Sequence, residues 1–135
     1  MDTEKILIVA LGGRVFGIHS ETGTELWKNE LQLGGISEVA LAVTTNRVFA
    51  SASAKRIFCI ERETGKTLWS SQTTGIGRAT IITNNETVIV GKGSCLDALT
   101  FDGEALWSKD LKIKPRDSAA LGFTNNVIQS DRYRK

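Results

Sequence analysis

Short stretches of the chain alternate between apolar and polar residues with a period of two. Such alternation is typical of β-strands that bury one face. Two of these stretches, 14–19 and 56–61, are rich in β-branched and aromatic residues, which favour strands. No segment has ten or more residues of helical periodicity with capping residues at its ends. The pattern therefore predicts an all-β fold.

The sequence repeats itself at intervals of 42 and 38 residues, as the tryptophans at positions 27, 69 and 107 show. When residues 14–27 are placed on residues 56–69 without a gap, eight of the fourteen positions are identical. Within each phrase that ends in Trp, a Thr-Gly or Asp-Gly pair predicts a hairpin turn, because Gly adopts positive φ without strain. The repeat indicates duplication of one structural unit.

Each complete unit is predicted to contain four strands. In the middle unit they span residues 38–44, 47–53, 56–62 and 67–73. In the next unit they span residues 78–83, 87–91, 94–101 and 104–111. Turns that contain Asn join the first strand to the second, at residues 44–46, 83–85 and 124–126. Four short antiparallel strands in roughly 40 residues are typical of a β-propeller blade.

The chain, residues 1–135, is predicted to be one domain of about three blades. The blades are placed at roughly 5–36, 37–76 and 77–116, and a partial blade at 117–131. The first blade begins with its second strand, Lys5 to Ala10, which aligns with residues 47–52 at an offset of 42. The partial blade supplies strands at 118–124 and 127–130, so the chain has one strand more than three blades need.

The Thr-Gly…Leu-Trp phrase resembles the repeat of the PQQ-like β-propellers, also called quinoprotein alcohol dehydrogenase-like repeats. In that family the Thr-Gly turn joins the last two strands of a blade, and the Trp docks between neighbouring blades. The family often has an Asp on the third strand; His19, Glu61 and Thr100 stand at or near that place, so this contact is expected to be partly lost. The resemblance implies a structural repeat signature made of Thr22, Gly23, Trp27, Thr64, Gly65, Trp69, Asp102, Gly103 and Trp107.

Three blades cannot close into a ring, since propellers usually need about four to eight. An open array would expose apolar faces at both ends, and such faces mark interaction sites. Two alternatives stay open. Copies of the chain join head to tail, so that a dimer has six blades, or the chain is part of a longer or split propeller. The surplus strand at 127–130 duplicates residues 6–10, which slightly favours the second alternative.

The composition of the chain bears on whether its partner is a nucleic acid or a membrane. The formal net charge is +2, from 17 Lys and Arg against 15 Asp and Glu, so nothing in the bulk charge requires nucleic acid or an anionic membrane. The longest apolar run, 6–11, is far shorter than the roughly 20 residues of a membrane span. The chain opens without the pattern of a secretory signal, so we expect a cytoplasmic protein. The basic residues at 112–116 and 131–135 are interpreted as solvated, which makes nucleic acid an improbable partner.

No residue is predicted to be catalytic, to bind a cofactor or to hold a metal. His19 is the only His and has no second ligand at metal-site spacing. Cys59 and Cys95 are expected to be small buried residues, because neither has a basic neighbour that would form a thiolate. The Gly-rich stretches 75–77 and 91–93 complete no nucleotide-binding motif and are predicted to be turns, and the sequon at 85–87 is interpreted as chance.

The leading hypothesis for function is a non-enzymatic scaffold that binds a ligand or protein, through self-association, other propeller blades or a protein partner. Its candidate surfaces are the loops between blades, at 32–37, 73–77 and 112–117. The first alternative is a fragment of a PQQ-dependent alcohol dehydrogenase, which would bring pyrroloquinoline quinone and Ca²⁺ as cofactors. The second is a lectin-like sugar binder. We expect no cofactor under the leading hypothesis.

Overall fold

In the computed structural model, the regular secondary structure of the described residues consists of short antiparallel strands and one 3-10 turn. The structure describes residues 2–32, 38–52, 55–115 and 117–128. The elements in these ranges are η1 (Thr3–Lys5), β1 (Ile6–Leu11), β2 (Arg14–His19), β3 (Glu25–Asn29), β4 (Ala40–Val43), β5 (Arg47–Ser51), β6 (Arg56–Glu61), β7 (Thr67–Gln72), β8 (Ala79–Asn84), β9 (Thr87–Lys92), β10 (Cys95–Thr100), β11 (Ala105–Asp110), β12 (Leu121–Phe123) and β13 (Asn126–Ile128).

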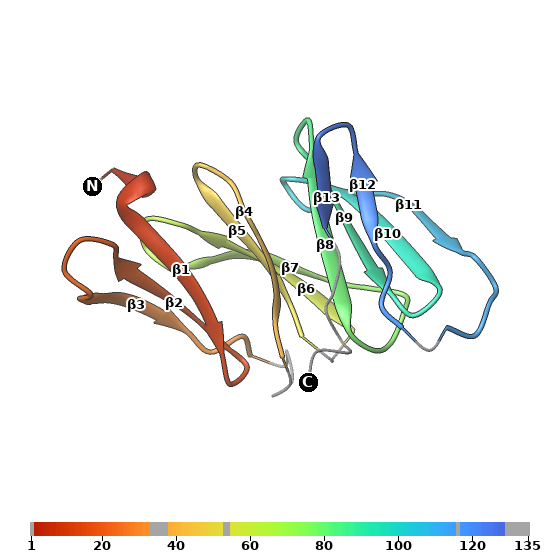
Figure 1. Cartoon of the computed structure of the whole chain (residues 1–135), viewed down its shortest axis with the longest axis horizontal. Coiled ribbons are helices and arrows are strands. Elements are labelled where there is room, and N and C mark those ends of the chain that lie inside the picture. Colours follow the sequence, from red (N-terminus) through yellow and green to blue (C-terminus); the bar gives the residue numbers. More distant parts are fainter. Residues whose placement is uncertain (1, 33–37, 53–54, 116, 129–135) are drawn as a thin grey trace.

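The strands form four separate antiparallel sheets that stand side by side (Figure 1). The first blade is the three-stranded sheet β1-β2-β3, the second blade is β4-β5-β6-β7, and the third blade is β8-β9-β10-β11. The pair β12-β13 begins a fourth blade and lies against β8. The prediction of an all-β fold with four-stranded blades is confirmed.

The strand bounds differ from the predicted ones by a few residues. The strand predicted at 118–124 is reduced to β12, and the strand predicted at 127–130 begins one residue earlier, while residues 129 and 130 lie outside the described residues. The alignment of the first strand at an offset of 42 is wrong by one. Ile8 pairs with Gly17, whereas Phe49 pairs with Cys59, which stands 42 residues after Gly17. The loops from β1 to β2 and from β5 to β6 differ in length, so the offset changes across them.

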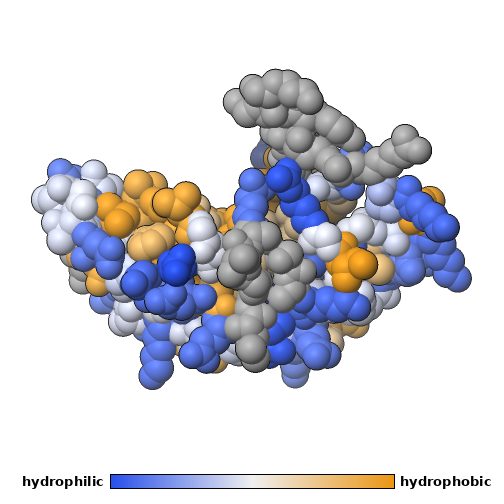
Figure 2. Space-filling view, turned by 90° about the horizontal axis from the view of Figure 1, so that it is seen from below, coloured by the Kyte–Doolittle hydropathy of each residue, from blue (hydrophilic) through white to orange (hydrophobic). Residues whose placement is uncertain are grey.

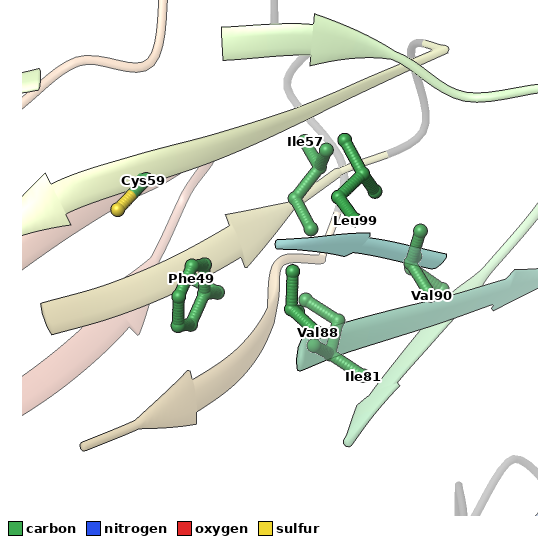
Figure 3. Close-up of a cluster of buried hydrophobic side chains, with 8 residues drawn as sticks. Phe49, Ile57, Cys59, Ile81, Val88, Val90 and Leu99 are labelled. Atoms are coloured by element: carbon green, nitrogen blue, oxygen red, sulfur yellow. The ribbon is translucent and has the colours of Figure 1, made fainter. Parts of the chain in front are cut away.

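The core lies between the blades and not within any one of them. Figure 3 shows the cluster between the second and third blades, where Phe49, Ile57 and Cys59 meet Val88 and Leu99. A second cluster fills the space between the first and second blades. It consists of Val15, Trp27, Leu31, Val48, Ala50, Phe58 and Ile60. A blade is therefore held mainly by the faces of its neighbours.

The turn between the third and fourth strands has the same form in each blade. Gly23, Gly65 and Gly103 all have positive φ, at 77°, 79° and 96°. The register of these two strands also shifts at the same place in each blade, directly after Gly17, Cys59 and Ala98. The Asp-Gly turn is one residue shorter than the two Thr-Gly turns, and it still returns the chain in the same direction.

Candidate functional site at the joints between blades

The joint between the first and second blades is made by Trp27 of β3. Its indole Nε1 donates a hydrogen bond of 2.9 Å to the carbonyl oxygen of Arg62. The indole ring lies on Gly65, so closely that a Cβ atom at that position would overlap the ring. Trp27 is only 8% exposed. The Gly of the Thr-Gly turn thus has two roles. It permits the positive φ, and it leaves space for the indole of the preceding blade.

The joint between the second and third blades repeats this arrangement. The Trp69 indole Nε1 donates a 2.8 Å hydrogen bond to the carbonyl oxygen of Phe101, and its ring lies over Gly103. The rings of Phe49 and Trp69 are tilted against each other with centroids 6.2 Å apart. The predicted docking of the signature Trp on the neighbouring turn is therefore present at both inner joints. We call the indole the plug and the Gly turn with its carbonyl the socket.

At the two ends of the array one half of a joint lacks a partner among the described residues. The third blade has a plug without a socket, and the first blade has a socket without a plug. Trp107 of β11 is 47% exposed. At the other end, Gly23 has no heavy atom within 4 Å of a Cβ built at its position, although its φ matches that of Gly65. Of the nine signature residues, Trp27 with Gly65 and Trp69 with Gly103 form the two assembled joints. Gly23 and Trp107 belong to the outer blades at opposite ends of the array.

The two inner joints differ in a second contact. At the first joint Leu31 lies in one buried cluster with Phe58 and Trp27. At the second joint Asp97 stands in the place of Phe58 and is 6% exposed. Its carboxylate accepts hydrogen bonds from the backbone N–H and the hydroxyl of Thr74, at 2.9 and 3.1 Å, and from the Ser108 hydroxyl at 2.7 Å. One joint is therefore closed by apolar packing and the other by a buried hydrogen-bonded carboxylate.

Arg62, directly after β6, ties the first two blades together. Its guanidinium donates hydrogen bonds to the carbonyl oxygens of Ile6, at 3.0 Å, and Thr44, at 2.8 Å, and lies 3.4 Å from the Glu4 carboxylate. Sequence reasoning missed this residue. The repeat gives no signal for it, because Ser20 and Phe101 take its place in the other two units.

The remaining candidate residues have structural surroundings. His19 accepts a 3.2 Å hydrogen bond at Nδ1 from the backbone of Glu21. Burial raises the pKa of the Cys59 thiol to about 11, so this thiol stays protonated at neutral pH, while Cys95 is half-buried. Burial lowers the pKa of Lys92 to about 8, against an opposing effect of the Asp97 carboxylate. The Gly-rich stretch 75–77 lies in the connection between β7 and β8, as predicted. The prediction of a turn at 91–93 is wrong for its first two residues, because Gly91 and Lys92 pair with β10 as the end of β9 and only Gly93, with positive φ, lies in the turn.

Among the residues that the structure describes, no three His, Cys, Asp or Glu side chains form a group that could hold a metal ion. We derive no catalytic step through a Ca²⁺ and quinone centre. No described helix is long and apolar enough to cross a membrane.

Both ends of the blade array expose apolar side chains. On the first blade the face turned away from the second blade carries Leu7, which is 54% exposed, and Leu11, which is 71% exposed, with Phe16 half-buried beside them. Figure 2 shows apolar side chains at the surface on the side of the molecule that carries β1–β3. At the other end Trp107 is joined by Leu111, which is 54% exposed. These two end faces are the candidate interaction surfaces.

Comparison with known proteins shows which family has this architecture. The family model described as outer membrane protein assembly factor BamB, a PQQ-like model, matches residues 2–132. No curated protein sequence gives a significant match. The structure is similar to BamB from Moraxella catarrhalis, with a TM-score of 0.67 and 19% identity over 81% of this chain and 35% of that one.

Two further solved structures share the fold. Quinohemoprotein alcohol dehydrogenase from Comamonas testosteroni aligns with a TM-score of 0.66 and 22% identity, over 78% of this chain and 19% of that one. The computationally designed Ika8 protein aligns with a TM-score of 0.75 and 21% identity, over 93% of this chain and 39% of that one. The chain thus spans about a third or less of the natural proteins to which it is similar. The chain belongs to the PQQ-like β-propeller family.

Proposed function

We propose that the chain is a non-enzymatic scaffold that binds protein through the end faces of its blade array. The observation that carries the proposal is the pairing of an unoccupied plug, Trp107, with an unoccupied socket at Gly23. Each occurs in a form that binds another blade elsewhere in the same molecule. Half-exposed Trp and Leu side chains in one patch are also the residue types that anchor protein interfaces.

The family supports a binding role. The matching model is described as a protein assembly factor, and BamB shares the fold. Quinohemoprotein alcohol dehydrogenases share it too, so the fold alone does not separate binding from oxidation. The exposed apolar side chains at the two ends of the array, among them Leu7 and Trp107, favour the binding role.

Site-specific photo-cross-linking in the producing cell tests the proposal. A benzophenone amino acid at Leu111, on the face of Trp107, is expected to give a discrete protein adduct. The same group at Leu106 is the matched control, since Leu106 is 49% exposed and neighbours Trp107 in the same strand, where successive side chains point to opposite faces. Adducts of equal yield at both positions, or none at Leu111, would contradict binding through this face.

A second measurement addresses the two alternatives. The purified chain is titrated with pyrroloquinoline quinone and Ca²⁺ while tryptophan fluorescence is followed, and dye-linked alcohol oxidation is measured on the same samples. It is then applied to a sugar array. We expect no saturable quenching, no oxidation and no sugar selectivity. Turnover of an alcohol would establish the dehydrogenase hypothesis, and selective binding of one sugar would establish the lectin hypothesis.

A further inference from the structure

We propose that the occupant of the exposed Trp107 face is the first blade of a second copy of this chain, joined head to tail. The inference rests on the proposed function and names its partner. Trp107 of one copy lies on Gly23 of the other and donates its indole N–H to the carbonyl oxygen of Ser20, which takes the place of Arg62 in the repeat. The inner joint of Trp27 and Gly65 is the template for this contact.

The socket on the first blade has the same residues as one that is already filled. Residues 14–27 and 56–69 are identical at eight of fourteen positions, among them the Thr and Gly of the turn. The φ angles of Gly23 and Gly65 are 77° and 79°. The backbone that receives Trp27 is therefore present, in the same conformation and without an occupant, at the start of the array.

The second contact favours a copy of this chain over an arbitrary blade. At the first inner joint the apolar Leu31, four residues after Trp27, shares a buried cluster with the apolar Phe58. At the second inner joint the polar Thr74, five residues after Trp69, binds the polar Asp97. Leu111 follows Trp107 by four residues, as Leu31 follows Trp27. Phe16 stands on the first blade where Phe58 stands on the second. The two exposed ends thus carry an apolar residue each, Leu111 on the third blade and Phe16 on the first. An apolar residue does not face a polar one in this joint.

The rest of the first blade's outer face fits the same role. Leu7 and Val9 lie opposite Ile18 and Phe16 across the β1–β2 pair. On the second blade the corresponding cross-strand pairs of β5 and β6 are buried against the first blade, as the cluster with Val15 and Trp27 shows. Docking of a second copy would bury this apolar face in the way that its counterpart is already buried.

Docking of the first blade also completes a sheet. The edge of β1 has no strand partner among the described residues, and β12 is the first strand of the fourth blade. β13 now occupies the edge of β12 through only three residue pairs, and its Val127 is 65% exposed. The six residues of β1 from the second copy would replace β13 there. Two copies joined in this way at both ends have six blades, within the range in which propellers close.

The test is self-association of the purified full chain, measured by light scattering and sedimentation over a wide concentration range. We expect a species of twice the chain mass. Trp107→Ala should raise its dissociation constant on the order of 30-fold or more, as loss of a central aromatic anchor does. Leu106→Ala, the exposed neighbour, should change it by less than about threefold. A monomer at all concentrations, or an assembly that survives Trp107→Ala, would overturn the inference.

A mixing experiment distinguishes a head-to-tail joint from any other dimer. Gly23→Ala breaks the socket, and Gly77→Ala is its control, since Gly77 also has positive φ and open space but lies in another connection. At a concentration between the dissociation constants of wild type and of the variants, Trp107→Ala and Gly23→Ala chains should each be monomeric alone. Mixed together they should form a heterodimer, because one joint then has both its plug and its socket. Failure of the mixture to associate, while wild type dimerises, would also overturn the inference.

Shortening the chain tests the strand exchange. Removal of residues 126–135 frees the edge of β12 and should tighten self-association, whereas weaker association would show that β1 does not replace β13. The outcomes remain separable from those of the proposed function. A monomeric chain that still gives a cross-linked adduct of Leu111 with a different protein would refute the second copy and leave the binding role standing.

Discussion

The two inner joints use the same plug and socket and differ in what closes them. At the first joint the indole of Trp27 is 8% exposed and Leu31 continues the apolar contact onto Phe58. At the second joint Trp69 is half-buried and the continuation is polar, through Asp97 with Thr74. The comparison teaches that the repeat conserves the point of attachment while the surrounding contact varies. The variable contact is where one joint can be distinguished from another.

The largest expected effect is the loss of an inner plug. Trp27→Ala should lower the free energy of unfolding by about 3–5 kcal/mol, because it removes a buried aromatic side chain and its hydrogen bond to the Arg62 carbonyl. Trp69→Ala should cost somewhat less, since that indole is less buried. Trp107→Ala, measured on dilute monomer, should cost below about 1 kcal/mol. Chemical denaturation of the three variants measures these values, and equal losses at all three positions would contradict the joint model.

The next effect isolates the socket. Gly65→Ala and Gly23→Ala carry the same backbone penalty, because both residues have φ near 78°. Only the Ala at 65 also meets the indole of Trp27. Gly65→Ala should therefore be less stable than Gly23→Ala by about 2 kcal/mol or more, in thermal or denaturant unfolding of dilute protein. If the two variants lose the same stability, the indole does not need the space above Gly65.

The polar contact of the second joint gives a smaller effect. Asp97→Ala should lower the free energy of unfolding by about 2 kcal/mol, because it leaves the Thr74 and Ser108 donors without their acceptor. Asp102→Ala is the control. It removes a surface ion pair with Arg47, with Asp102 87% exposed, and should cost less than about 0.5 kcal/mol. Denaturant unfolding at pH 7 compares them, and a neutral Asp97→Ala variant would mean that the joint closes without this carboxylate.

The smallest expected effect is a dependence on pH. The pKa of Lys92 is lower in the folded chain, about 8, than the ordinary 10.5, so the unfolded chain binds more protons between these values. Stability due to this group should therefore rise with pH across that window, by about 1 kcal/mol from pH 8 to 9. The raised pKa of Cys59 acts in the opposite direction from pH 9 to 11. Stability is measured as a function of pH for wild type and for Lys92→Met, and the difference between the two curves isolates the contribution of the lysine. A difference that does not change with pH would contradict the lowered pKa of Lys92.

The repeating features of the molecule could be predicted from the sequence, and the features that occur once could not. Trp27 and Trp69, with the turns that receive them, were predictable because each is present in every unit and the period fixes its place in a blade. Arg62 and Asp97 occur in single units, so no comparison within the chain marks them. Their roles depend on which carbonyls and hydroxyls the neighbouring blade presents, and this is set only when the blades pack.

The unoccupied ends of the array could be inferred only in part. Counting strands predicts that three blades leave open faces, but it does not say which side chains those faces carry. The burial of Trp27 and the exposure of Trp107 supply that information. The error of one residue in the placement of the first strand has a similar cause, because a loop of different length moves the register without changing the pattern of the strands.

The joints have a direction, since the earlier unit always gives the indole and the later unit always gives the glycine. An array with such polarity needs no new surface in order to grow, because every added unit brings both halves of the next contact. Chemistry alone would then permit any number of units. The number of units is decided by the angle between successive blades. When the array closes into a ring, the indole of the last unit binds the glycine turn of the first, and no free half of a joint remains.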